Sequence, residues 1–449
     1  MNIIIVGIGE IGSHLALGLS RENHSIVVIE TEESVADALR SRIDARVLVG
    51  DGTSINVLLD ANVPECDLFF SLTSNTNVNL VASSIAKQLG AKKTICRIHP
   101  GVQRESLFLD HGEHFGIDYL FSSERLAAIE LAKYVRNPGA SLVEEIARGY
   151  VEIQQIRVPH ESKLANIPLK ELEFPSRVRI GAILRGERTV IPGSSDILEG
   201  GDVVTLVGEP SKLFEVSQKI RNRPLKETES SIVIFGGGEY GYSLAQTLES
   251  WNCRIRIFEE NAERCLELSD LLTNVTIINA DATSLSEMKE EQIGDADFFI
   301  AVTDVDEDNV MTCLQAHNLG TRYCLPLIHR ADYADAMTGF GNRLGILAAV
   351  SPREATRKDL SRFITSDRFH LLQKMGGIEL IESSVSGSSH ANGKQVKDID
   401  WPEDCILVAI LHGTRGQVPA ASDEITEGDS VYALVGPKAK RKFLKLISP

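Results

Sequence analysis

Short runs of apolar residues alternate with segments in which apolar residues recur every three or four positions. The apolar runs have the length of buried strands, and they lie at residues 3–6, 26–29, 68–73 and 93–96. The intervening segments predict amphipathic helices at residues 12–21, 33–41 and 79–89. The alternation predicts a parallel, doubly wound α/β sheet, because a parallel neighbour is reached through a crossover helix.

A further helix is predicted at residues 122–135. It is followed by Asn137, Pro138 and Gly139, where proline disfavours helix in the residue before it and glycine permits a turn. The helix predicted at residues 122–135 suits a crossover or dimerising role.

The same pattern recurs in the second half of the chain at an almost fixed interval. The strands expected there lie at residues 232–235, 254–258 and 298–303. Gly7 and Gly236 open equivalent glycine-rich turns, and Glu30 and Glu259 are separated by the same interval. Matches at nearly that interval pair Asp51 with Asp281, Thr73 with Thr303, Gly186 with Gly413, Pro192 with Pro419 and Asp202 with Asp429. Chance similarity does not hold register over so many elements, so the chain is predicted to be two copies of one unit.

Each copy has a larger α/β part followed by a smaller β-rich part with Gly and Pro turns. A polar linker around residues 222–231 separates the copies. The predicted nucleotide-binding domains span residues 1–140 and 229–366, and the smaller domains span residues 141–228 and 367–449.

Composition and charge limit the kinds of molecule that the protein is expected to bind. The 449 residues include 46 Lys and Arg against 63 Asp and Glu, a net charge of −17. Phosphate backbones and anionic lipids repel such a chain, so neither nucleic-acid binding nor direct lipid binding is expected. No apolar run is long enough for a membrane span, and a strand at the very start leaves no room for a signal peptide. The seven cysteines form no C-x-x-C pair, which is typical of reduced thiols in a cytoplasmic protein and not of a zinc site.

The glycine-rich turn carries the first indication of chemistry. Gly7, Gly9 and Gly12 form G-x-G-x-x-G between a strand and a helix, and Glu30 ends the strand that follows this helix. In this context Gly7 makes the turn, Gly9 lets a pyrophosphate approach the backbone, and Gly12 allows close helix packing. A carboxylate at Glu30 would bind ribose hydroxyls and repel a 2′-phosphate, which favours NAD(H), ATP or ADP over NADP(H). The alternative is that Glu30 is an ordinary solvated strand end.

Three more residues lie where such sheets bind ligands. Asp51 and Asp281 follow the third strands, where each would reach the adenine amino group or instead cap a helix. Arg97 ends a strand and would face phosphates, or instead form a surface salt bridge. The second copy has Leu327 at that position, so the two sites are not expected to be equivalent.

Signals of catalysis are missing from the sequence. The domain after the first nucleotide-binding fold lacks clustered His, Lys or Arg, and there is no zinc-ligand spacing, G-x-S-x-G elbow or P-loop lysine motif. No catalytic residues and no metal site are therefore expected. The alternatives to a regulatory role are an NAD-dependent oxidoreductase and a purely structural assembly subunit.

The repeated motifs resemble the family of regulator-of-potassium-conductance domains (RCK, also called KTN or TrkA-N), each followed by a TrkA-C domain. The match is carried by the two glycine-rich turns, by residues 50–53 and 280–283, by 301–309, by 137–140, and by the I-L-E-G-G-D and E-I-T-E-G-D segments at 197–202 and 424–429. The resemblance covers essentially the whole chain. It implies two Rossmann-like doubly wound parallel sheets, each followed by a small α+β TrkA-C domain.

The resemblance also implies a function. Members bind NAD(H), ATP or ADP and form cytoplasmic rings, here expected to be a homotetramer, on the inner face of the cell membrane. There they gate potassium transport by a membrane subunit, which in this case would be TrkH-like or TrkG-like. In the first copy, the predicted cofactor-binding residues are Gly7, Ile8, Gly9, Glu10, Ile11, Gly12, Glu30, Asp51, Gly52, Thr73 and Arg97. In the second copy they are Gly236, Gly237, Gly238, Glu239, Tyr240, Gly241, Glu259, Asp281, Ala282 and Thr303.

Overall fold

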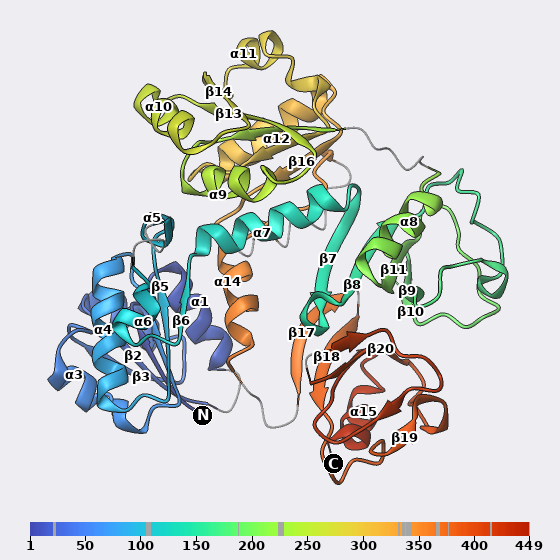
Figure 1. Cartoon of the computed structure of the whole chain (residues 1–449), viewed down its shortest axis with the longest axis horizontal. Helices are drawn as coiled ribbons and strands as arrows, with labels where there is room; N and C mark the ends of the chain where they lie inside the picture. Colours follow the sequence, from blue (N-terminus) through green and yellow to red (C-terminus); the bar gives the residue numbers. More distant parts are fainter. Residues whose placement is uncertain are drawn as a thin grey trace. The chain divides into compact units, whose positions relative to one another are not determined.

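The computed structural model describes most of the chain (Figure 1). The described residues are 1–20, 24–104, 109–186, 188–222, 229–330, 333–334, 337, 344–364, 369–375, 377–413 and 415–448. Two predicted domain boundaries, after residues 228 and 366, fall at segments outside the described residues. Within the described part, no helix is both long enough and apolar enough to cross a membrane.

The chain folds into two compact units, and each unit takes pieces from both halves of the sequence. One unit consists of Met1–Ala132 and Glu229–Ile364, and the other of Lys133–Thr228 and Thr365–Pro449. Like parts of the two copies therefore fold together: the α/β parts in the first unit and the β-rich parts in the second.

The first copy contributes a six-stranded sheet of order β3-β2-β1-β4-β5-β6, in which every ladder is parallel. Its strands are β1 Asn2–Val6, β2 Ser25–Glu30, β3 Arg46–Val49, β4 Leu68–Ser71, β5 Lys93–Arg97 and β6 Tyr119–Phe121. Its helices are α1 Glu10–Leu19, α2 Glu33–Arg40, α3 Ile55–Asp60, α4 Thr76–Leu89, α5 Pro100–Arg104, α6 His111–Phe115 and α7 Ser123–Arg136. The predicted doubly wound sheet is confirmed, and its order reverses between β1 and β4, where such folds bind ligands.

Two helices begin earlier than their apolar spacing predicts. Helix α1 begins at Glu10, because Gly9 is already its N-cap. Helix α4 begins at Thr76, because the Asn75 side chain accepts hydrogen bonds from the backbone N–H groups of Asn77 and Val78.

The second copy contributes a five-stranded parallel sheet of order β14-β13-β12-β15-β16. Its strands are β12 Ser230–Phe235, β13 Cys253–Glu259, β14 Val275–Asn279, β15 Phe298–Ala301 and β16 Tyr323–Pro326. Its helices include α9 Glu239–Leu248, α10 Ala262–Leu271, α11 Leu285–Glu290, α12 Asp306–Leu319 and α14 Pro352–Ser361. Among the described residues of this copy, single parallel bridges join Cys324 to Ile346 and Leu327 to Val350 at the edge where β6 pairs with β5 in the first copy.

Helix α14 of the second copy packs against the first copy, beside α1 (Figure 1). Leu360, on α14, and Ile364, just after it, are buried in the apolar core that contains Ile3 and Ile5 of β1. We refer to α7 and α14, which follow the last sheet pairing of their copies, as the two crossover helices.

The second unit contains two five-stranded antiparallel sheets, of order β10-β9-β11-β8-β7 and β17-β18-β23-β20-β21. The first piece supplies β7 Ala140–Ile146, β8 Val151–Arg157, β9 Arg179–Arg185, β10 Arg188–Val190, β11 Val203–Gly208 and α8 Pro210–Ile220. The second piece supplies β17 His370–Met375, β18 Ile378–Ser384, β19 Lys394–Gln395, β20 Cys405–His412, β21 Arg415–Gln417, β22 Glu424–Ile425, β23 Ser430–Val435 and α15 Lys440–Ile447. Ile153 and Val207 of the first piece share one buried core with Leu380, Val408 and Leu434 of the second.

Candidate functional site

The glycines of the first turn have the geometry that their three predicted roles require. Gly7 has φ +85°, and a Cβ there would lie 2.6 Å from Thr73 Cγ2. A Cβ at Gly12 would lie 2.0 Å from the Gly7 carbonyl oxygen, so α1 packs directly on the turn. Gly9 faces open space, and no side chain caps the first N–H groups of α1. This open helix N-terminus is the arrangement that binds phosphate groups in Rossmann-like folds.

Glu30 is held at the end of β2 by its own surroundings. Its Oε2 accepts a hydrogen bond from the Ile8 backbone N–H at 3.0 Å, and its Oε1 accepts hydrogen bonds from Thr31 N at 2.8 Å and Glu32 N at 3.1 Å. Burial alone would raise the pKa of Glu30, but these hydrogen bonds outweigh it and lower the pKa. The residue is therefore a fixed carboxylate at neutral pH, as a ribose-binding role requires.

A cavity of about 690 Å³ lies over this turn, within the volume range of small-molecule sites. Most of the predicted first-site residues line it: Gly7, Gly9, Glu10, Ile11, Glu30, Asp51, Gly52, Thr73 and Arg97. Two do not. Ile8 is buried behind the turn and offers its N–H to Glu30, and Gly12 lies in the contact between helix and turn.

Asp51 lines the cavity but does not cap a helix. Its Oδ1 accepts hydrogen bonds from the backbone N–H and the hydroxyl of Thr53, both at 2.8 Å, and these hydrogen bonds lower its pKa. The N-cap of α3 is Ser54. Asp281 makes the same turn with Thr283, and the N-cap of α11 is Ser284, so the predicted capping alternative is wrong in both copies.

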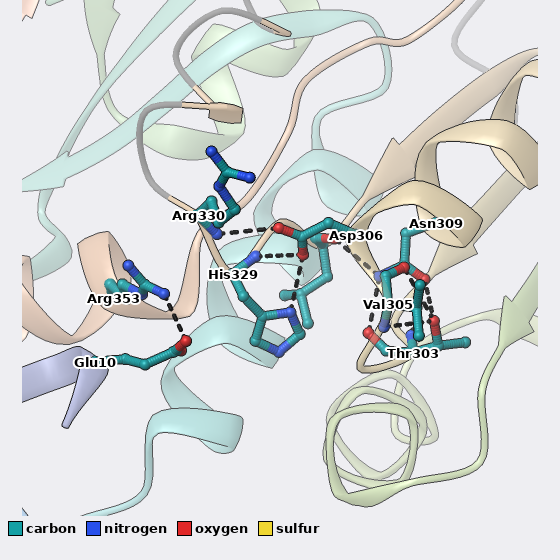
Figure 2. A network of polar contacts seen from close by, with 9 residues as sticks. Glu10, Thr303, Val305, Asp306, Asn309, His329, Arg330 and Arg353 are labelled. Atoms are coloured by element: carbon teal, nitrogen blue, oxygen red, sulfur yellow. Dashed lines mark hydrogen bonds and ion pairs between the residues drawn. The ribbon is translucent and has the colours of Figure 1, made fainter.

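Asn79 connects two walls of the first cavity, a role that sequence reasoning missed. Its Oδ1 accepts hydrogen bonds from the N–H and hydroxyl of Thr73, and its Nδ2 donates to the carbonyl oxygens of Thr73 and Arg97. Asn309 makes the same four bonds with Thr303 and Leu327, and Figure 2 shows those with Thr303. The recurrence of Asn at this place in both copies was the available signal.

Arg97 lines the first cavity and also forms an ion pair, and its contact with phosphates stays a prediction. Its Nη2 lies 3.1 Å from Glu124 Oε1, and its side chain, 24% exposed, lines the cavity. Glu124 is held in turn by the Ser122 hydroxyl, which donates to Oε2 at 2.8 Å. The ion pair therefore forms part of the cavity wall.

Four lining residues come from the second copy: Tyr240, His329, Pro352 and Arg353. Tyr240 was predicted at the second site, yet it faces the first cavity. His329 is fixed by Asp306, whose Oδ1 accepts its backbone N–H at 2.7 Å and lies 3.0 Å from its Nδ1 (Figure 2). Burial would raise the pKa of Asp306, but the hydrogen bonds from the backbone of His329 and Arg330 lower it.

The second glycine-rich turn is covered differently. Glu259 Oε2 accepts the Gly237 N–H at 2.8 Å, as Glu30 accepts that of Ile8. Arg264 occupies the position of the cavity-lining Val35 of the first copy, and its Nε donates to the Gly237 carbonyl oxygen at 2.8 Å. Its Nη2 lies 3.1 Å from Glu239. A cation of the second copy thus lies against its own turn.

The remaining predicted residues of the second copy keep the geometry of the first. Gly236 has φ +104°, a Cβ at Gly238 would meet nothing within 4 Å, and a Cβ at Gly241 would lie 1.9 Å from the Gly236 carbonyl oxygen. Ala282 is buried. Among the described residues, no three His, Cys, Asp or Glu side chains are grouped to hold a metal ion.

Two parallel α/β folds, one with a cavity of nucleotide size at its glycine-rich turn, place this chain in the Rossmann-like class. The family model of the TrkA-N domain matches residues 3–122 and 232–352, and that of the TrkA-C domain matches residues 153–221 and 380–448. The chain belongs to the TrkA family, which confirms the resemblance seen in the sequence.

Curated relatives match almost end to end. The Trk system potassium uptake protein TrkA of Halomonas elongata is 31% identical over 455 residues, covering 98% of this chain and 97% of that protein. The TrkA homolog of Archaeoglobus fulgidus is 30% identical over 430 residues, covering 96% of each. Among solved structures, the GsuK RCK domain has a TM-score of 0.60 at 17% identity, covering 100% of this chain and 95% of that one. The GsuK channel bound to NAD has a TM-score of 0.59 at 18% identity, covering 100% and 79%. At these identities the structural likeness establishes the fold.

Proposed function

We propose that this protein is a regulatory subunit of a Trk-type potassium uptake system, and that an adenine nucleotide bound in the first cavity controls potassium transport by the membrane subunit. The observation that carries the proposal is the cavity itself, where the open N-terminus of α1, the fixed carboxylate of Glu30 and the guanidinium of Arg97 converge. Family membership gives the transport context.

The proposed ligands are NAD(H) and/or ATP and ADP. Each has an adenosine ribose for Glu30 and a di- or triphosphate for the turn. The negative charge of Glu30 beside the ribose position disfavours a 2′-phosphate, and hence NADP(H). The GsuK structures bound to NAD and to ADP are consistent with ligands of this class for the fold.

The proposed setting follows from the family. The membrane partner would be TrkH-like or TrkG-like, the protein would be a homotetramer on the cytoplasmic face of the membrane, and it would have no enzymatic activity. The four-domain division at residues 1–140, 141–228, 229–366 and 367–449 belongs to the same proposal. A ligand regulates such an assembly only if it binds one conformation more tightly than the other.

The test compares Glu30→Gln with the wild type. Loss of the carboxylate weakens nucleotide binding about tenfold or more, because hydrogen bonds to a charged group contribute about 1.5–3 kcal/mol each. Binding is measured by calorimetry with NAD, NADH, ATP and ADP, and potassium flux is measured in vesicles that contain the membrane subunit. Glu33→Gln is the matched control, because Glu33 is an exposed carboxylate three residues further along the chain.

Three outcomes would contradict the proposal. Wild-type protein that binds none of these nucleotides would indicate a structural assembly subunit. Turnover of NADH absorbance with a substrate would indicate an oxidoreductase. Flux that keeps its nucleotide dependence in Glu30→Gln would contradict the assignment of the first site.

A further inference from the structure

The two crossover helices carry opposite charges at equivalent positions. Glu124 and Arg353 are separated by the same interval as the two glycine-rich turns. They are also equivalent in the structure. Phe121 pairs with Arg97 at the end of β5, and Glu124 lies three residues after Phe121. Val350 bridges to Leu327 just past β16, and Arg353 lies three residues after Val350. The first copy thus has an acid where the second has a base.

Arg353 lies at the first cavity, although it belongs to the second copy. Its Nη2 lies 2.7 Å from Oε1 of Glu10, the first residue of α1, as Figure 2 shows. Arg353 lines the cavity, and its Nε is buried without a hydrogen-bond partner in the described part of the chain. A buried donor without a partner is costly, so this guanidinium has binding capacity that Glu10 does not use.

The partner of Arg353 is weakly held. The Glu10 side chain is 62% exposed, and an ion pair with so exposed a partner stabilises little. Glu10 also lies at the open N-terminus of α1, so a polyphosphate bound there would bring further negative charge beside its carboxylate. The guanidinium of Arg353 lies in the same cavity as that of Arg97, close enough to Glu10 to offset this negative charge.

In the second copy, the acid equivalent to Glu10 is paired with an arginine of the same copy. Glu239 occupies the position of Glu10, and its partner at 3.1 Å is Arg264 of the adjacent helix α10. Glu124, the acid at the equivalent position of the first crossover helix, is paired with Arg97 at 3.1 Å. The first turn therefore has a cation from the other copy's crossover helix, whereas the second turn has Arg264 of its own copy.

We propose that Arg353 is a phosphate-binding residue of the first nucleotide site, supplied by the second copy. When an adenine nucleotide with two or more phosphates binds, the guanidinium moves from Glu10 to the terminal phosphate, where a bidentate contact is stronger than the exposed ion pair. This inference rests on the proposed function and adds the residue that distinguishes ligands by phosphate number.

The move of the Arg353 guanidinium from Glu10 to a phosphate would be transmitted through α14. Arg353 is the second residue of this helix, and Leu360 near its end is buried in the core of the first copy. Asp359 Oδ2 accepts a hydrogen bond from the Tyr119 hydroxyl at 2.8 Å. A change of partner at Arg353 therefore acts on an element that contacts both copies.

The test is calorimetric titration of the full chain with adenosine, AMP, ADP and ATP. Arg353→Gln should weaken ADP and ATP binding about 10- to 100-fold while changing adenosine and AMP binding less than about twofold. Glu10→Gln, which frees the guanidinium and removes a negative charge, should tighten ATP binding. Arg357→Gln is the matched control, because it removes an arginine one turn further along α14 whose partner is Glu354, and it should bind all four ligands as the wild type does.

The inference is overturned if Arg353→Gln binds all four ligands like the wild type, or if it weakens adenosine and ATP by the same factor. Should Arg353→Gln fail to fold, Glu10→Gln decides, and unchanged or weaker ATP binding in that variant overturns the inference. Wild-type protein that binds no adenine nucleotide overturns the proposed function and this inference together, whereas normal wild-type binding with an unchanged Arg353→Gln overturns this inference alone.

Discussion

One buried amide fixes two walls of the first cavity. Asn79 is 1% exposed and uses both ends of its side chain, accepting from Thr73 and donating to the carbonyl oxygens of Thr73 and Arg97. A short side chain without these groups would leave several buried donors and acceptors unpaired. Because Thr73 and Arg97 line the cavity, the same bonds that stabilise the fold also position the site.

We predict that Asn79→Ala lowers the free energy of unfolding by about 1–3 kcal/mol, the usual cost of leaving a buried polar group unpaired, and weakens nucleotide binding about tenfold. Urea unfolding and calorimetry measure the two effects. Asn309→Ala is the matched control, since Asn309 makes the same bonds in the second copy, and the variant should be destabilised equally without loss of first-site binding. Equal loss of binding in both variants would contradict the role of Asn79 at the site.

At the scale of elements, α14 is a helix of the second copy that completes the core of the first. Leu360 is 0% exposed among the side chains of the first sheet, and Tyr119 and Asp359 are joined by a hydrogen bond between the copies. The helix is anchored at one end by packing and presents Arg353 at the other. Its stability is therefore linked to the geometry of the cavity.

Leu360→Ala is expected to lower the free energy of unfolding by about 2–5 kcal/mol, because it removes buried apolar area and leaves a cavity. Leu266→Ala on α10, where the leucine is 71% exposed, should change it by less than about 0.5 kcal/mol. Both are measured by urea unfolding. A cost for Leu360→Ala as small as that of the control would show that α14 does not contribute to the core.

Glu354 gives α14 a predicted dependence on pH. Burial alone would raise its pKa, but hydrogen bonds from Arg357, together with His14 whose Nε2 lies 3.5 Å from Oε2, lower the pKa to about 2 from an ordinary value of 4.5. A depressed pKa stabilises the folded state fully above about pH 4.5, and that stabilisation is lost as the pH falls toward 2.

The stability difference between wild type and Glu354→Gln should therefore shrink as the pH falls through this window, as measured by urea unfolding at a series of pH values. Glu33→Gln, which changes an exposed carboxylate, should show no such trend. A constant difference between wild type and Glu354→Gln would contradict the depressed pKa.

At the scale of the whole molecule, both compact units draw on both halves of the chain. The first combines residues 1–132 with 229–364, and the second combines 133–228 with 365–449. Neither half contains a complete core for the second unit, because buried Ile153 and Val207 pack with buried Leu380 and Val408. The halves are thus expected to depend on each other.

We predict that residues 1–228 and 229–449, expressed together as separate chains, associate into a stable complex. The apolar surfaces that each would expose alone are covered by the other. Co-purification through a tag on one half measures the association. Val408→Asp in the second half should abolish or strongly weaken it, and halves that elute separately and remain folded would contradict the shared cores.

Much of the fold was predictable because the determinants of a Rossmann-like unit lie close together in the sequence. Strand length, helix spacing, the close approach of Gly12 to Gly7 and the bond from Ile8 to Glu30 all involve residues within a single βαβ unit, and the second copy repeats them. Helix starts were less accurate where a cap such as Asn75 lies outside the apolar pattern. The repeat shows that Glu124 and Arg353 hold equivalent positions with opposite charges, but it does not show which cavity either side chain lines.

By itself, the sequence determined two α/β copies, their glycine-rich turns, the acids at the strand ends and the absence of a second arginine equivalent to Arg97. Tertiary structure alone decided that Tyr240 and Arg353 face the first cavity and that Arg264 lies against the second turn. The physical reason is the range of the interactions. Turn sterics and backbone hydrogen bonds act between near neighbours, whereas the pairing of the copies depends on burying surfaces from opposite halves of the sequence, which no local pattern encodes.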